Sequence, residues 1–196
     1  MKRRIVLILV FALAIAAVAP AQLTADQKAN SDRILTKVRK LDMYNQVLPV
    51  LFTKDQIKAI LPVLEEHRAN ASNQEMDENK MMLGWEKDLD EQLKRCKDKG
   101  EMPKPEVLNM ANIYFKVFAM KRKAIVDDAV EKLKEVLKDK CNDGQLKAAE
   151  NALDPRNYVP DADPAKMTDD EKLDMWIRLV LIDKNTYDIL VDLSKK

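Results

Sequence analysis

The stretch that decides the fold is "LFTKDQIKAI", residues 51–60, where a short apolar segment gives way to a long charged one. Thr53 stands where a helix can begin, and its side chain can accept a hydrogen bond from the backbone N–H of Gln56. The Gln56 side chain can in turn accept one from the N–H of Thr53, which completes a capping box. Phe52 and Ile57 stand at the spacing of a hydrophobic staple. The stretch therefore predicts the start of a helix.

A second stretch, "KCNDGQLKAAENAL" at residues 140–153, repeats this arrangement. Asn142 can act as the cap, and Gln145 follows three residues later, as the capping box requires. Cys141 and Leu146 occupy the two staple positions. The two motifs therefore predict two helix starts of the same kind, one before and one after the long charged segment.

Proline and glycine divide the chain between the two motifs into two long helices. The first is predicted over residues 53–99, with a kink at Pro62, and ends where Gly100 and Pro103 follow. The second is predicted over residues 105–139 and would be ~52 Å long at 1.5 Å per residue. Two such helices joined by a short turn predict an extended antiparallel hairpin. Its apolar stripe needs another surface to cover it, and a second copy of the chain is the simplest cover.

The predicted fold class is all-α: a long antiparallel helical hairpin with an N-terminal helix and a C-terminal helical extension. Only 3 Gly and 5% aromatic residues, beside 34% charged residues, are typical of long solvated helices. The predicted hairpin domain covers residues 22–153, and a Pro-rich linker covers residues 154–166. The extension covers residues 167–196 and carries Trp176, which is expected to dock back on the hairpin. The N-terminal helix is predicted to have an apolar stripe of Ile34, Val38, Leu41 and Leu48.

The N-terminal segment "MKRRIVLILVFALAIAAVAPAQ" has the features of a secretory signal peptide. It combines a basic start, an apolar run over residues 5–19 and small residues around Pro20. A retained membrane anchor is the alternative, but this run is shorter than the ~20 residues that a spanning helix needs. We therefore expect cleavage after Ala21, removal of residues 1–21, and a periplasmic or otherwise exported, soluble mature chain.

Composition argues against several functions. Residues 1–21 hold three basic and no acidic residues, so the mature chain has 31 Lys and Arg against 33 Asp and Glu. This balance does not favour nucleic-acid binding, which depends on concentrated positive charge. His67 is the single histidine, and it is expected to be a solvated helix residue. The sequence holds no G-x-S-x-G, P-loop or H-E-x-x-H motif, so no catalytic residue, cofactor or metal site is predicted.

The two motifs and the helices between them resemble the Spy/CpxP family of exported stress proteins, the LTxxQ family, over roughly residues 48–153. The motifs stand here as Phe52-Thr53-Lys54-Asp55-Gln56 and Cys141-Asn142-Asp143-Gly144-Gln145. Neither motif has the leucine that begins LTxxQ: Phe52 and Cys141 stand in its place. The second motif has Asn in place of Thr, and Asn caps a helix equally well. The resemblance implies an all-α protein whose curved hairpins pair into a cradle-shaped dimer. It also implies an ATP-independent holder of unfolded or partly folded exported proteins.

A shallow surface that mixes Lys and Arg with Met and aromatic side chains can bind many sequences weakly, because thioethers repack readily. The helices predicted over residues 53–99 and 105–139 carry such residues, although most of the apolar ones could instead belong to the hairpin or dimer core. Two other functions stay open: a periplasmic sensor that binds a membrane regulator, with metal sensing less favoured, and a structural envelope protein. The candidate client-binding residues are Met76, Met81, Met82, Trp85, Met110, Met120, Lys121 and Arg122.

The two cysteines should lie far apart. Cys96 is expected near the tip of the hairpin, and Cys141 at the C-terminal end of the helix predicted over residues 105–139. A disulfide needs Cα atoms within about 7 Å, which a straight helix between the two residues forbids inside one chain. Three arrangements stay open: two free thiols, a disulfide across a dimer, and a break in the helix predicted over residues 105–139. The favoured interpretation is that Cys141 is a buried free thiol.

Overall fold

The structure is a computed structural model that describes residues 24–159 and 163–195. Every regular element in these two ranges is helical, so the prediction of an all-α fold is confirmed. The predicted signal peptide over residues 1–21 lies outside the described residues. Residues 160–162 of the predicted linker lie outside them as well.

The chain divides into two compact units, Met1–Arg39 and Lys40–Lys196. Helix α2, Ala25–Val47, runs across the boundary between them. It begins with a capping box in which the Thr24 N–H donates to Gln27 Oε1 at 2.9 Å and the Gln27 N–H donates to Thr24 Oγ1 at 3.2 Å. Its predicted apolar stripe is exposed. The α2 residues that are buried, Met43 and Val47, belong to the second unit.

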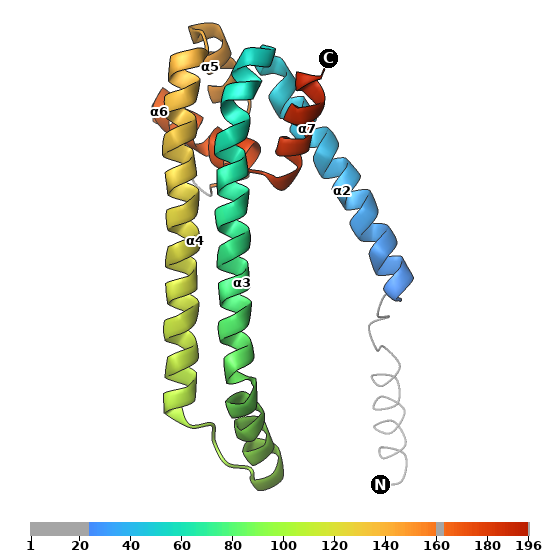
Figure 1. The fold of residues 1–196 in the computed structure, drawn as a ribbon, viewed down its shortest axis with the longest axis vertical. Coiled ribbons are helices and arrows are strands. Elements are labelled where there is room, and N and C mark those ends of the chain that lie inside the picture. Colours follow the sequence, from blue (N-terminus) through green and yellow to red (C-terminus); the bar gives the residue numbers. More distant parts are fainter. Residues whose placement is uncertain (1–23, 160–162, 196) are drawn as a thin grey trace, which may run out of the picture. The chain divides into compact units, whose positions relative to one another are not determined.

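Two long helices, α3 (Lys54–Lys99) and α4 (Pro105–Lys140), dominate the second unit and run antiparallel, side by side (Figure 1). α3 continues through Pro62 and stops at Gly100, whose φ of 64° is the left-handed conformation that favours glycine at a helix C-terminus. α4 starts directly with a proline, which is preorganised for the first helical position. Gly100 and Pro105 therefore set the two ends of the loop that connects α3 to α4.

The remaining elements of the second unit gather where α3 begins and α4 ends, which we call the closed end (Figure 1). We call residues 69–126, which include the connecting loop, the loop half. Four further helices and two 3₁₀ turns contribute to the closed end. They are η1 (Leu48–Val50), α5 (Asp143–Glu150), η2 (Pro155–Asn157), α6 (Asp169–Trp176), the π-helical η3 (Ile177–Leu181) and α7 (Lys184–Ser194).

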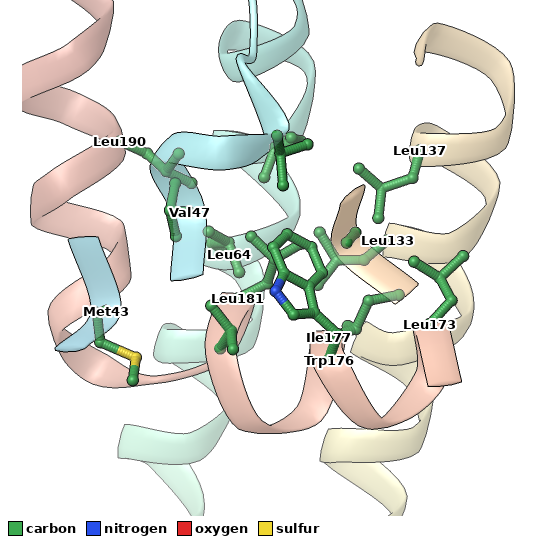
Figure 2. Close-up of a cluster of buried hydrophobic side chains, with 14 of the residues drawn as sticks. Met43, Val47, Leu64, Leu133, Leu137, Leu173, Trp176, Ile177, Leu181 and Leu190 are labelled. Atoms are coloured by element: carbon green, nitrogen blue, oxygen red, sulfur yellow. The ribbon is translucent and has the colours of Figure 1, made fainter. Parts of the chain in front are cut away.

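One hydrophobic core joins these elements at the closed end, and Trp176 lies in it with no exposed surface (Figure 2). The Phe52 ring, at the start of α3, lies 6.4 Å from the Trp176 ring between centroids. The C-terminal helices therefore complete the same core as the two capping motifs. Other residues of this core are Met43, Val47, Leu64, Leu133, Leu137, Leu173, Ile177, Leu181 and Leu190.

Ion pairs also attach the C-terminal helices to α4. Asp170 accepts hydrogen bonds from the ammonium groups of Lys134 at 2.8 Å and Lys138 at 2.7 Å. Arg178 pairs with Asp127 at 2.7 Å and with Asp174 at 2.5 Å. These contacts place α6 and η3 against the second half of α4.

The Asp170 contacts predict a dependence of stability on pH. Lys134 and Lys138 lower the pKa of Asp170 to about 2, from its ordinary value of 3.8. Because the folded-state pKa is the lower one, the stabilisation is present above the unfolded-state pKa and is lost as pH falls through about 2. The Asp170 side chain is 55% exposed, so solvent screening limits its contribution to less than about 1 kcal/mol.

We therefore expect Asp170→Asn to lower the free energy of unfolding slightly at pH ~6 and by less still at pH ~2. Urea unfolding of both proteins across this range measures the difference. A difference that stays constant with pH would contradict the assignment.

Candidate functional site

The two capping motifs meet at the closed end, and each forms a complete capping box. The Gln56 N–H donates to Thr53 Oγ1 at 3.2 Å, and the Thr53 N–H donates to Gln56 Oε1 at 2.8 Å. The Gln145 N–H donates to Asn142 Oδ1 at 3.0 Å, and the Asn142 N–H donates to Gln145 Oε1 at 3.1 Å. The same local chemistry thus starts α3 and α5.

The two glutamines also bind each other. Each Nε2 donates to the Oε1 of the other side chain at 2.9 Å, so Gln56 and Gln145 form a reciprocal amide pair. Gln56 Nε2 also donates to the carbonyl of Lys140 at 2.7 Å, and Gln145 Nε2 donates to that of Leu51 at 3.1 Å. Every donor and acceptor position of both buried amides is therefore used. We call this arrangement the cap interlock.

The staple residues surround the cap interlock and reach the core. Ile57 is buried, while Phe52, Cys141 and Leu146 are half-buried and pack against the core. Cys141 and Cys96 are both free thiols. Burial raises the pKa of Cys141, so its thiol is ionised less readily and is a poorer nucleophile than an exposed one. The motif residues therefore stabilise the closed end, and their polar groups are already satisfied.

A cleft opens between α3 and α4 directly beyond the closed end. It has a volume of about 450 Å³. It begins beside Arg68 and Asp127, which pair with Asp188 at 3.9 Å and Arg178 at 2.7 Å. The C-terminal helices therefore border one end of the cleft. Its lining residues are His67, Ala71, Gln74, Glu75, Glu78, Met82, Arg122, Ile125 and Val126.

An ion pair between a buried carboxylate and an exposed guanidinium forms the polar part of the cleft. Glu78 is only 2% exposed and accepts a hydrogen bond from Arg122 Nε at 2.8 Å and a second from Arg122 Nη2. Gln74 Nε2 also donates to the Glu78 carboxylate, at 3.0 Å. The hydrogen bond from Arg122 holds the pKa of Glu78 below its usual value, and Glu78 raises the pKa of Arg122. Both groups are therefore charged at neutral pH, and each neutralises the other.

His67 lies at the end of the cleft, and here the sequence-based expectation of a solvated histidine is wrong. The side chain is half-buried, and burial lowers its pKa, so the imidazole is neutral at pH 7. Its Nδ1 atom is buried and has no hydrogen-bond partner in the part of the chain that the structure describes. The packing of α4 against α3 removes this ring from water, which helical periodicity alone did not reveal.

The cleft continues along α3 toward the connecting loop as a shallower hollow of about 350 Å³. Met82 lines both spaces, so they are neighbours on α3. We call the two neighbouring spaces together the α3 groove; their α3 lining residues run from His67 to Leu93, or ~39 Å along a helix. The lining residues of its second part are Asn79, Met82, Leu83, Glu86, Leu89, Asp90 and Leu93.

The structure separates the eight candidate client-binding residues. Met82 and Arg122 come together in the cleft. Trp85 instead packs between the helices, with its ring 4.2 Å from that of Tyr114. Met81 is half-buried. The remaining candidates, Met76, Met110, Met120 and Lys121, are exposed.

Sequence analysis missed several exposed apolar residues of the same region. Leu83 is 60% exposed, Ile113 is 61% exposed and Phe115 is 57% exposed. A signal was present in the sequence, because these residues fall outside the stripe that the helical period assigns to the seam between α3 and α4. Apolar residues on two sides of one helix indicate a second surface that needs a partner or remains in water.

Residues 24–159 and 163–195 hold no group of three or more His, Cys, Asp or Glu that could bind a metal ion. No helix in these ranges has the length and apolar character of a membrane span.

The fold and the site together define an all-α protein. Its two long antiparallel helices are closed at one end by a shared core and carry an open groove beyond it. In comparisons with known proteins, the chain matched no family model, no curated protein and no solved structure.

Proposed function

We propose that this protein is an exported, ATP-independent chaperone or envelope-stress accessory that holds unfolded or partly folded proteins on the loop half. The observation that carries the proposal is the exposure of large apolar side chains there. Exposed large apolar side chains that gather in one region of a protein often mark a binding surface. The most exposed large apolar side chains are Met102 at 86%, Met120 at 68%, Leu93 at 67%, Ile113 at 61%, Met76 at 60%, Leu83 at 60%, Phe115 at 57% and Leu108 at 51%.

The positions of the C-terminal helices support this function. α7 contacts the first part of α3, where Tyr187 donates a hydrogen bond to Glu65 at 2.5 Å. α6 and η3 contact α4 from Asp127 onward. Both sets of contacts lie outside the loop half. A client bound there would leave the core at the closed end intact.

The side-chain chemistry of the loop half suits weak binding of many sequences. Methionine side chains adapt to different partners because they are unbranched and polarizable. Between Val107 and Val126, α4 carries four basic residues and no acidic one, and Arg122 alone of the four is paired with a buried carboxylate. The resemblance of the two motifs to Spy/CpxP proteins and the predicted signal peptide agree with a chaperone outside the cytoplasm.

The test is suppression of aggregation by the mature chain, residues 22–196, without nucleotide. A chemically reduced or denatured client is followed by light scattering, and we expect suppression at a near-stoichiometric ratio. The double variant Ile113→Gln/Phe115→Gln should need at least about three times more protein for the same effect, because it removes apolar contact area. No suppression by the unmodified chain would exclude this function.

A matched control tests whether suppression of aggregation depends on the loop half or on exposed apolar residues anywhere in the protein. Tyr158 and Val159 are 46% and 48% exposed and lie outside the loop half. Tyr158→Gln/Val159→Gln should therefore suppress aggregation as well as the unmodified chain. Equal losses in both double variants would assign the effect to overall hydrophobicity instead of to the loop half.

A further inference from the structure

We infer that the α3 groove selects polypeptide segments that combine apolar side chains with lysine or arginine. This inference rests on the proposed function and deepens it by naming the class of segment that one surface prefers. The loop half as a whole could bind apolar sequences of any charge. The α3 groove is the part of it whose charges favour one class.

The floor of the groove supplies the apolar contact. Met82, Leu83 and Leu93 are 40%, 60% and 67% exposed, and all three line the hollow along α3. Ile125 and Val126 of α4 extend this apolar lining into the deeper cleft. At ~3.3–3.6 Å per residue, a groove of ~39 Å accommodates about 11 residues of an extended segment.

The charges along the groove are predominantly negative. Its lining contains four carboxylates and one guanidinium group. The guanidinium of Arg122 is already paired with Glu78. The other three carboxylates make no ion pair within the residues that the structure describes: Glu86, Asp90 and Glu75, of which Glu75 lies close enough to Arg122 to raise its pKa. The groove lining has a net charge of −3.

These carboxylates give the groove its selectivity. A segment with lysine or arginine beside its apolar residues would meet opposite charge along the rim. A segment with Asp or Glu would meet repulsion, so charge complementarity separates the two classes even when their apolar contacts are equal.

His67 adds no charge to the groove. A neutral imidazole brings no positive charge that would attract an acidic segment. Its Nδ1 atom is buried and has no partner among the described residues, so it presents no donor to a bound segment.

The test measures binding of two labelled peptides by fluorescence anisotropy, using the mature chain. Both peptides have the same length and the same Leu, Met and Phe positions, but one carries Lys where the other carries Glu. Reversing two groove charges with Glu86→Lys/Asp90→Lys should weaken binding of the Lys peptide by about ten-fold and should not weaken binding of the Glu peptide. Raising the salt concentration to ~0.5 M should reduce this difference.

The control variant is Asp77→Lys/Glu91→Lys, which makes the same charge change on exposed parts of α3 outside the groove lining. It should change the affinity for the Lys peptide by less than about two-fold, because its changed charges lie outside the groove and are screened by salt. Equal weakening by both double variants would overturn the inference. So would an unchanged affinity of the groove variant for the Lys peptide.

Two further measurements separate this inference from the proposed function and from self-association. If the chain suppresses aggregation but both peptides respond alike to the groove variant, the inference fails and the chaperone function stands. If the groove variant changes sedimentation of the protein while peptide affinities stay unchanged, a second copy of the chain occupies the groove, and the inference is again overturned.

Discussion

Replacing Trp176 with alanine should lower the free energy of unfolding by about 3–5 kcal/mol, the range for removing a fully buried large aromatic side chain. Trp176 has no exposed surface and lies among side chains from α2, α3 and α4, so its removal leaves a cavity where these elements meet. Urea unfolding followed by far-UV circular dichroism measures the loss. The same experiment shows whether the C-terminal helices unfold together with the long helices.

Two comparison variants identify the cause of the loss. Trp176→Phe keeps an aromatic ring and removes the Nε1 donor, which has no hydrogen-bond partner among the described residues, so it should cost less than about 1.5 kcal/mol. Trp85→Ala removes a half-buried ring of the loop half and should have a smaller effect than Trp176→Ala. A loss below about 1 kcal/mol for Trp176→Ala would mean that the C-terminal helices do not share the core.

Replacing Gln56 with alanine should lower the free energy of unfolding by about 2–4 kcal/mol, which is large for a polar residue. The substitution breaks the cap interlock and leaves the Lys140 carbonyl, the Thr53 N–H and one donor and one acceptor of Gln145 without their partners. Buried polar groups left unsatisfied are the costly outcome. Thermal or urea unfolding of the variant measures the effect.

The chain supplies a matched control for this prediction. Gln27 forms the same capping box with Thr24, but it is exposed, and water can replace its side chain. Gln27→Ala should therefore cost less than about 0.5 kcal/mol. A double-mutant cycle of Gln56→Ala and Gln145→Ala should give a coupling energy of about 1–3 kcal/mol. Independent, additive effects would show that the two glutamines act only as local caps.

The helix starts could be predicted from the sequence because capping depends on residues within four positions of each other. Thr53 with Gln56 and Asn142 with Gln145 form the hydrogen bonds that their spacing implies. The hydrogen bonds between the two boxes could not be predicted, since Gln27 stands in the same Thr-x-x-Gln box and has no such partner among the described residues. The approach of the start of α5 to the start of α3 creates these bonds.

The candidate site was harder to predict, because burial and pairing depend on distant residues. Arg122 has the sequence context of a free basic residue, yet Glu78, 44 residues earlier in the chain, neutralises it. His67 has a polar neighbourhood in sequence and lies half-buried in a cleft. Periodicity indicated that Ile34 and Val38 share a face of α2, but both are exposed.

By itself, the sequence determined the all-α class, the ends of the long helices and the residues that cap them. These features depend on backbone hydrogen bonds and side chains a few positions apart, so they are encoded locally. Tertiary structure alone decided which apolar faces are covered and which charges are paired. A helical period shows which residues share a face, but whether that face meets another helix or water depends on segments far away along the chain.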